Sequence, residues 1–371
     1  MRYDLAIIGG GLAGMATAYY AARAGARVVV IEARDVNLGA SGSNAGSIHA
    51  QIPFDPFRHL GADWARHYSE VLPLFIESIG LWAGLEAELG GDLGFHAKGG
   101  LMVAGSEAEM AMLREKSAIE QAQGLRIDLW SAEDLAERAP FLTGGYPGGA
   151  FCPIEGKADP FKVVPLFLKR AREAGAVLLR NAPVTAITPE AGGFAVTAGE
   201  VIHAACVVNA AGAQAADVAR MVGVSVPIEA HAIQVSVTEK RPQLLPWLLY
   251  FTSEKLTLKQ AVEGGFLIGG GWPARMRGGP VVDHRSTLRN LALAQRLVPG
   301  LADVQIVRSW AAMVNGTKDW RPVLGEVPAV PGFFLNLFPW MGFTAGPVVS
   351  KAIAALALGQ APEVDLTPFA L

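Results

Sequence analysis

The first 32 residues constrain the fold more than any other part of the chain. An apolar run ending at Ile8 leads into a Gly-Gly-Gly-Leu-Ala-Gly turn, an alanine-rich segment follows, and a second apolar run ends at Glu32. In this strand–turn–helix–strand context, Gly9 permits the tight turn, Gly11 lets the backbone approach a pyrophosphate, and Gly14 lets helix and strand pack closely. The start of the helix offers unpaired N–H groups to phosphates. The segment therefore predicts a dinucleotide site.

Glu32 narrows the choice of dinucleotide. A carboxylate at the end of the second strand can accept hydrogen bonds from both hydroxyls of an adenosine ribose, and it repels a 2′-phosphate. Glu32 follows Gly14 by 18 residues, as this interpretation requires. The pattern therefore argues against NADP. The alternative is a glycine-rich turn in an ordinary βαβ unit.

Length and composition set the broad class of protein. The chain has 371 residues, which exceeds the usual size of one hydrophobic core, so we expect two closely joined domains. Hydrophobic residues make up 51% and the formal net charge is −3, which gives no basic surface for nucleic acid. The apolar excess favours a buried interface with a partner, or equally a large core.

The sequence gives few signs of targeting or of metal chemistry. The first strand begins near residue 3, which leaves no room for a signal peptide, and no run of 18 apolar residues is present, so we expect a cytoplasmic protein without a transmembrane segment. The two cysteines, Cys152 and Cys206, form neither a disulfide framework nor an iron–sulfur spacing. We expect no metal site.

Periodicity and turn residues predict the secondary structure. The expected helices are 12–24, 56–89, 106–122, 131–138, 160–174, 286–297 and 347–358. The expected strands are 177–179, 183–187, 194–196, one from Cys206, 231–239, 248–258, 265–271 and 304–312. Dinucleotide-type segments occur at the start, in the middle and at the end. We therefore expect a discontinuous cofactor domain (1–80, 145–215 and 318–371) and an inserted substrate domain (81–144 and 216–317).

Five further segments carry a resemblance to a known family. They are the small-residue stretch 39–47, the strand end Val207-Val-Asn-Ala-Ala-Gly212, the segment Gly149-Ala-Phe-Cys-Pro-Ile-Glu-Gly-Lys-Ala-Asp-Pro160, the segment Asp319-Trp-Arg-Pro-Val-Leu-Gly325, and Gly342-Phe-Thr-Ala-Gly-Pro347. Together they resemble the D-amino-acid-oxidase-like (DAO) family of FAD-dependent amine oxidoreductases over essentially the whole chain. Within that family, Ser41–Gln51 is similar to the FAD-bearing beta subunit of opine (octopine and nopaline) oxidases or dehydrogenases.

The resemblance implies a fold, a cofactor and a reaction. The fold is α/β (α+β), with a Rossmann-type FAD-binding domain beside an inserted mixed-sheet substrate domain of the p-hydroxybenzoate-hydroxylase type, whose 231–312 region covers the flavin. The reaction is oxidation of a secondary or primary amine to an imine by hydride transfer to flavin N5, here on an opine or another N-substituted amino acid. Because no cysteine follows Cys206, we expect non-covalent FAD.

The expected FAD contacts come from the glycine turn, the small-residue stretch, two strand ends and the last glycine-rich segment. They are Gly9, Gly11, Leu12, Ala13, Gly14, Glu32, Ala33, Arg34, Ala40, Ser41, Ser43, Asn44, Ala45, Gly46, Ser47, Val184, Ala210, Ala211, Gly212, Gly316, Met341, Gly342, Phe343 and Thr344. The helix expected from Pro347, capped by Thr344 or Gly346, would point its positive end at the reduced flavin.

The substrate side departs from the family pattern. Many members carry an arginine that clamps the substrate carboxylate, and Val314 stands at that position here. The expected catalytic residues are His49, Lys259 and Asn315, and the expected substrate contacts are His49, Gln234, Tyr250, Trp272, Lys318 and Arg321. A lone histidine is more often structural, and a lone surface lysine or arginine is more often solvated.

Several functions remain open at this level. The favoured interpretation is the catalytic subunit of a hetero-oligomeric dehydrogenase whose partner subunits carry a second flavin or an iron–sulfur cluster. The alternatives are a stand-alone sarcosine-, glycine- or D-amino-acid-type oxidase that makes hydrogen peroxide, a non-catalytic FAD-binding scaffold, and an NAD-dependent dehydrogenase. The sequence names neither the amine and its stereochemistry nor the electron acceptor and the subunit stoichiometry.

Overall fold

The N-terminal apolar runs form the centre of a mostly parallel sheet. The computed structural model describes residues 2–371. The path of the first sheet is β19-β20-β11-β1-β2-β8, and β9 and β10 join it beside β11. Strands β1, β2, β8, β11 and β20 are parallel, and β19 runs antiparallel to β20. Their bounds are β1 Arg2–Ile8, β2 Val28–Ile31, β8 Val177–Leu179, β9 Ala186–Glu190, β10 Gly193–Ala198, β11 Glu200–Asn209, β19 Val323–Glu326 and β20 Phe333–Leu337.

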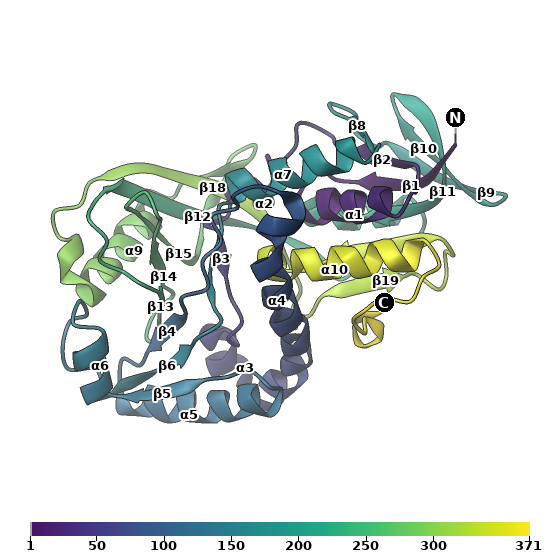
Figure 1. Cartoon of the computed structure of the whole chain (residues 1–371). Helices are drawn as coiled ribbons and strands as arrows, with labels where there is room; N and C mark the ends of the chain where they lie inside the picture. The colour runs from purple at the N-terminus through teal and green to yellow at the C-terminus, as the bar shows by residue number, and fades with distance from the viewer. Residues whose placement is uncertain (1) are drawn as a thin grey trace.

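Both faces of the first sheet are covered, which explains why its central strands are continuously apolar. Leu5 and Ile7 pack into a core with three helices, α1 (Leu12–Arg23), α7 (Pro160–Glu173) and α10 (Gly342–Ala357). Ala6 and Ile8 face a second core with β10 and α8 (Ala215–Arg220). Strands β1, β2 and β11 end at the same edge of this sheet, and the start of α1 lies at that edge (Figure 1).

The second sheet also has eight strands, in the order β18-β12-β15-β14-β13-β4-β6-β5. One face packs on α6 (Ala132–Arg138) and α9 (His284–Leu297), and Leu249, Leu258 and Phe266 point into that core. Because strand side chains alternate, Tyr250 and Lys259 lie on the opposite face, toward the first sheet. The bounds are β4 Gly100–Val103, β5 Asp128–Ser131, β6 Gly148–Cys152, β12 Glu229–Lys240, β13 Leu248–Phe251, β14 Thr257–Gln260, β15 Gly265–Pro273 and β18 Ile306–Gly316.

Short elements and two long helices join the two halves. Figure 1 shows α2 and β3 between the sheets, and α4 running along the junction. Strand β3 pairs with β7, and α4 packs on α10. The remaining bounds are α2 Ala40–Ser43, β3 Ser47–Ile48, α3 Phe54–Tyr68, α4 Leu72–Leu89, α5 Glu107–Ala122, β7 Gly156–Lys157, β16 Arg275–Met276 and β17 Pro280–Val281, with short 3₁₀ turns at Ser69–Val71, Gly212–Gln214, Pro299–Leu301 and Thr367–Phe369.

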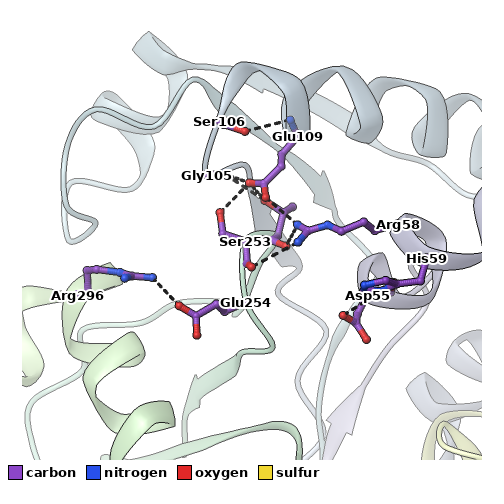
Figure 2. Close-up of polar contacts among 10 residues, drawn as sticks. Asp55, Arg58, His59, Gly105, Ser106, Glu109, Ser253, Glu254 and Arg296 are labelled. Atoms are coloured by element: carbon purple, nitrogen blue, oxygen red, sulfur yellow. Dashed lines mark hydrogen bonds and ion pairs between the residues drawn. The ribbon is translucent and has the colours of Figure 1, made fainter.

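A cluster around Glu109 ties α3 and α5 to the end of β13 (Figure 2). The carboxylate of Glu109 accepts hydrogen bonds from Gly105 N (2.9 Å), Thr252 Oγ1 (2.7 Å) and Ser253 Oγ (2.7 Å). Arg58 of α3 pairs with its other oxygen at 2.7 Å. The cluster is mostly buried, and it fixes the position of α3 against the second sheet.

Helix starts marked by side-chain caps are confirmed. Ser106 caps α5, Ser131 and Asp134 form a capping box on α6, and Asp159 caps α7. In each case the cap oxygen accepts a backbone N–H of the first turn, an interaction that depends only on neighbouring residues.

Five boundaries differ from the expectation. The expected helix 56–89 is two helices and a 3₁₀ turn, and α3 itself is kinked at Gly61, where φ is 82°. The stretch 248–258 is two antiparallel strands, and the strand expected over 183–187 runs from Ala186 to Glu190. The last helix begins at Gly342, so Pro347 lies inside it. Strand β6 lies in the second sheet, whereas the expected boundary at 145 assigns it to the cofactor domain.

The structure contains no helix, within residues 2–371, that has both the length and the apolar character needed to cross a bilayer.

Candidate active site

The glycine turn after β1 has no room for side chains. A Cβ atom at Gly14 would lie 1.9 Å from the carbonyl oxygen of Gly9, and one at Gly9 would lie 2.4 Å from the carbonyl oxygen of Ala210. Gly9 also has a φ of 115°, which favours glycine. At Gly11 a Cβ atom would come within 2.9 Å of Ser41 Oγ. The bare backbone thus forms a cradle at the start of α1.

Glu32 lies beside this cradle at the end of β2. Its Oε2 accepts the N–H of Gly10 at 2.6 Å, and its Oε1 accepts the N–H of Arg34 at 2.8 Å. The backbone of 181–182 bonds to the carbonyl oxygens of Glu32 and Arg34, which brings Val184 to the same corner, while Ala33 and Arg34 are exposed.

The small-residue stretch 39–47 crosses from the cradle to the second sheet. Ser41 Oγ accepts the N–H of Leu12 at 2.9 Å, and the indole Nε1 of Trp310 in β18 donates to Ser43 O at 2.7 Å. The side chain of Asn44 holds the turn by accepting the N–H of Gly46 at 2.6 Å. Gly46 has a φ of 74°, and a Cβ atom there would meet Ala158 O at 2.1 Å.

The start of α10 closes the other end of this region. Thr344 Oγ1 accepts the backbone N–H of His49 at 2.8 Å. The carbonyl oxygen of Thr344 accepts hydrogen bonds from Ser78 Oγ (2.6 Å) and Trp82 Nε1 (2.9 Å) of α4. These contacts hold Met341 to Thr344 in the first turn, with the positive end of the helix toward His49.

These residues fit a dinucleotide such as FAD. A Cβ atom at Gly9 or Gly14 would collide with neighbouring backbone, and one at Gly11 would press on Ser41, so only glycines allow this bare turn at the carboxyl ends of parallel strands, where such ligands bind. Ala210 to Gly212 follow β11 at the same edge, and Ala40 to Ser47 connect it to the start of α10. We expect FAD to lie along these segments, with Gly316 following at the end of β18.

A buried polar chain leads from His49 into the second sheet. His49 Nδ1 lies 2.7 Å from the hydroxyl of Tyr250, and that hydroxyl lies 3.0 Å from Oε2 of Glu155. Lys259 is 2% exposed, and its Nζ donates to Ser47 Oγ at 2.9 Å. The structure thus brings together three of the expected substrate-side residues, His49, Tyr250 and Lys259.

Burial shifts the pKa values of these groups. Burial, with the positive charge of Lys259, lowers the pKa of His49 to about 3, so the imidazole is neutral at physiological pH. Burial and the neighbouring Lys157 hold the pKa of Lys259 well below its usual range. Burial and the negative charge of Glu155 raise the pKa of Tyr250 well above its usual value. The site therefore carries a neutral imidazole beside a lysine that is poorly solvated.

Gln234 and Trp272 lie on the other face of the second sheet. Gln234 donates to Asp283 O and to Thr287 Oγ1 of α9, and Arg289 of α9 lies over the ring of Trp272. Gln234 of β12 and Trp272 of β15 lie opposite each other in the sheet, and both side chains are on the face that packs on α9. They therefore point away from His49. They do not join the site.

Lys318 and Arg321 are also apart from the buried chain. Lys318 is exposed in the loop after β18. Arg321 is buried, where its guanidinium contacts His67, Glu70 and the carbonyl oxygen of Pro368. These contacts connect the C-terminal 3₁₀ turn with the end of α3 and the 3₁₀ turn Ser69–Val71, and they occupy the guanidinium group of Arg321.

Asn315 adjoins an aromatic stack next to α10. Its carbonyl oxygen accepts the N–H of Trp340 at 3.1 Å. The ring of Trp340 stacks between His231 and Trp320, with centroid separations of 4.8 Å on each side. Both tryptophans have positive φ, 57° and 69°, a conformation that costs free energy in residues other than glycine. Asn315 therefore acts here through its backbone.

Glu155 and Gln51 are the site residues that the sequence reasoning did not assign. Both are buried, and Gln51 Nε2 donates to Glu155 Oε2 at 3.1 Å. The available signal was an acidic residue between Ile154 and Gly156 in an otherwise apolar stretch. A buried acid of this kind needs several partners, and a single sequence does not show them.

Comparisons with known proteins agree with this geometry. A family model described as FAD-dependent oxidoreductase (DAO) matches residues 4–356. An opine oxidase subunit from Rhizobium meliloti is 29% identical over 339 residues, which cover 90% of this chain and 87% of that protein. The beta subunit of sarcosine oxidase from Rhizobium meliloti (strain 1021) is 26% identical over 388 residues, which cover 100% of this chain and 88% of that protein. The crystal structure of glycine oxidase from Geobacillus kaustophilus superposes with a TM-score of 0.87 at 26% identity, over 100% of this chain and 98% of that one.

Proposed function

This chain belongs to the DAO family of FAD-dependent oxidoreductases, and we propose that it oxidises the secondary amine of an opine-class, N-substituted amino acid to an imine. FAD is its cofactor, and oxidation of an amine or amino acid is its general reaction. When bound, FAD supplies the acceptor for the hydride from the carbon next to the amine nitrogen. The single observation that carries the proposal is the meeting of His49, Tyr250 and Lys259 next to the start of α10.

Each of these residues has a distinct role in the proposal. The neutral imidazole of His49 accepts a hydrogen bond from the amine and so orients its nitrogen. Lys259 pairs with a carboxylate of the substrate. The negative charge of that carboxylate would favour the protonated form of the buried Lys259 amine. Val314 stands where relatives carry a clamping arginine, and a lysine at another point of the second sheet supports a different placement of the carboxylate.

We further propose that the chain is the FAD-bearing subunit of a hetero-oligomeric dehydrogenase. Two of the most similar proteins are named as subunits of larger enzymes, one of an opine oxidase and the other of a sarcosine oxidase. The partner subunits would carry the next electron acceptor, a second flavin or an iron–sulfur cluster.

The test is anaerobic reduction of the FAD-loaded protein. Purified protein is mixed with octopine, nopaline, proline, hydroxyproline, sarcosine, glycine and D-amino acids, and the flavin absorption band is followed by stopped flow. The proposal expects fast bleaching by opines and slow or no bleaching by simple amino acids. Fast bleaching only by sarcosine, glycine or a D-amino acid would replace the proposed substrate class.

Admitting air then distinguishes the two kinds of acceptor. A dehydrogenase subunit regains its oxidised spectrum slowly and forms little hydrogen peroxide. Rapid recovery with stoichiometric hydrogen peroxide would instead identify a stand-alone oxidase.

A further inference from the structure

We propose that Glu155 and Tyr250 are positioning residues that hold the His49 proton on Nδ1, so that Nε2 is a fixed hydrogen-bond acceptor for the N–H of the substrate amine. The inference rests on the proposed function for the identity of that amine. The tautomer itself is a property of this chain alone, and it can be measured without substrate.

The hydrogen bonds to Glu155 determine which groups donate and which accept between Glu155, Tyr250 and His49. Four donors converge on its carboxylate: the backbone N–H groups of Ala50 (2.7 Å) and Gln51 (2.9 Å), the side-chain amide of Gln51 (3.1 Å) and the hydroxyl of Tyr250 (3.0 Å). An ionised carboxylate only accepts hydrogen bonds, so four donors match its capacity. Burial raises the pKa of Glu155, and these four donors oppose that rise.

Once the Tyr250 proton points at Glu155, the tyrosine oxygen can only accept from His49. The separation of Nδ1 from that oxygen is 2.7 Å, so Nδ1 carries the proton and donates it. Within residues 2–371, Nε2 of His49 makes no hydrogen bond, and His49 as a residue is only partly buried. Nε2 is therefore the nitrogen left for a ligand.

The backbone that carries His49 is held equally firmly. Four consecutive N–H groups, from His49 to Ile52, each donate to a buried side-chain oxygen: Thr344 Oγ1, Glu155 Oε1 twice, and Glu120 Oε1. These bonds hold the backbone of His49 in place, and the 2.7 Å hydrogen bond from Nδ1 to Tyr250 then sets the orientation of the ring. Such a fixed neighbour is what a hydrogen bond that orients a reacting nitrogen requires.

Glu120 supplies a matched comparison. It is buried like Glu155 and binds the same segment, but it contacts Ile52 N and Lys116 and touches neither Tyr250 nor His49. A carboxylate that only stabilises the fold should behave like Glu120. The groups that face His49 from the packed elements are Tyr250 and Lys259, with Glu155 acting through Tyr250.

The experiment measures the His49 tautomer by ¹⁵N NMR in FAD-loaded protein labelled at its histidines, without substrate. The chain has seven histidines, so His49→Asn identifies the signal. We expect a protonated Nδ1 and a bare Nε2 in the natural protein. In Glu155→Gln the new amide donates to the Tyr250 oxygen, the hydroxyl turns to His49, and the proton moves to Nε2. The double variant Lys116→Met/Glu120→Gln, which leaves no unpaired buried charge, should retain the natural tautomer.

A bare Nδ1 in the natural protein, or an unchanged tautomer in folded Glu155→Gln, would overturn the inference. If Glu155→Gln does not fold, Tyr250→Phe answers the same question, because it removes the only hydrogen-bond partner that the described residues, 2–371, offer to Nδ1 of His49, and it should abolish the single tautomer. An unaltered His49 spectrum in that variant would also contradict the relay.

Kinetics then connect the tautomer to the amine. For the amine that bleaches the flavin, Glu155→Gln should raise KM at least tenfold, because Nε2–H and the substrate N–H would both be donors. The control double variant should leave KM within about twofold. A shifted tautomer with an unchanged KM would show that Glu155 and Tyr250 set the His49 tautomer but that Nε2 does not bind the substrate amine. If no amine bleaches the flavin, the proposed function fails. The NMR result still shows whether Glu155 and Tyr250 set the tautomer.

Discussion

At the scale of single residues, the predicted FAD-binding turn depends on glycines that have no side chain. Gly14 faces the carbonyl oxygen of Gly9, and a Cβ atom would stand 1.9 Å from it. We predict that Gly14→Ala forces α1 away from β1 and abolishes FAD retention, measured as bound flavin per chain after gel filtration. Gly39→Ala is the control, because a Cβ atom at Gly39 meets nothing within 4 Å and its φ of −85° suits any residue. Normal flavin content in Gly14→Ala would contradict the cradle.

Lys259 allows the opposite kind of prediction, a gain in stability with a loss of function. Its pKa is lowered by burial, so between the folded pKa and the ordinary lysine value of 10.5 the unfolded chain binds more protons than the folded chain, and stability rises with pH across that window. Replacing a poorly solvated ammonium group with an apolar side chain of similar length removes this cost.

We predict that Lys259→Met raises the melting temperature at pH 7, and that the gain shrinks by pH 10, as measured by calorimetry. The same variant should reduce flavin bleaching by opines at least tenfold. Lys255→Met, at an exposed lysine paired with Asp55, is the control. A lower melting temperature for Lys259→Met at pH 7 would show that the Ser47 hydrogen bond outweighs desolvation.

At the scale of elements, the Glu109 cluster joins α3 and α5 to β13. Burial disfavours the charge on Glu109, but the hydroxyls of Thr252 and Ser253, the N–H of Gly105 and the guanidinium of Arg58 outweigh it and lower the pKa of this carboxyl. A lowered folded pKa means that the stabilisation is complete above the ordinary value of 4.5 and is lost as the pH falls through the folded value.

We predict that Glu109→Gln lowers the free energy of unfolding by about 1.5–3 kcal/mol at pH 7, the range for hydrogen bonds to a charged group. The difference between the variant and the natural protein should shrink on acidification below pH 4.5, in urea titrations at several pH values. Glu107→Gln, an exposed residue of the same helix, should change little. A pH-independent difference would show that shape rather than charge holds the cluster.

Elements were predictable from sequence where their signals are local. The caps at Ser106, Ser131 and Asp159 fix three helix starts within the first turn. The start of α10 at Gly342 was not predictable, because Ser78 and Trp82 of α4 hold its first turn through Thr344. In the candidate site, too, only the features with local signals were predictable. The glycine turn shows its chemistry in six residues, whereas the face on which Gln234 lies depends on how β12 and β15 pair with α9.

At the scale of the whole molecule, one core serves both halves. The same cluster of buried side chains contains Leu5 and Ile7 of the first sheet and Met102, Ala150 and Cys152 of the second. We therefore predict a single cooperative unfolding transition for both sheets. Added FAD, which binds only the folded chain, should raise the melting temperature with its concentration. Calorimetry measures both effects, and two separate transitions, with only one responding to FAD, would contradict the shared core.

The long-range pairing of the first sheet has a consequence for synthesis on the ribosome. Strand β1 pairs with β11, which emerges some 200 residues later, and α1 packs against α10 (Gly342–Ala357). The nascent chain therefore exposes the apolar sides of β1 and α1 until these later elements have left the exit tunnel. Such a chain depends on chaperones that shield those surfaces. The cradle for FAD is likewise complete only after β11 has paired with β1, because Ala210 at the end of β11 lies against Gly9.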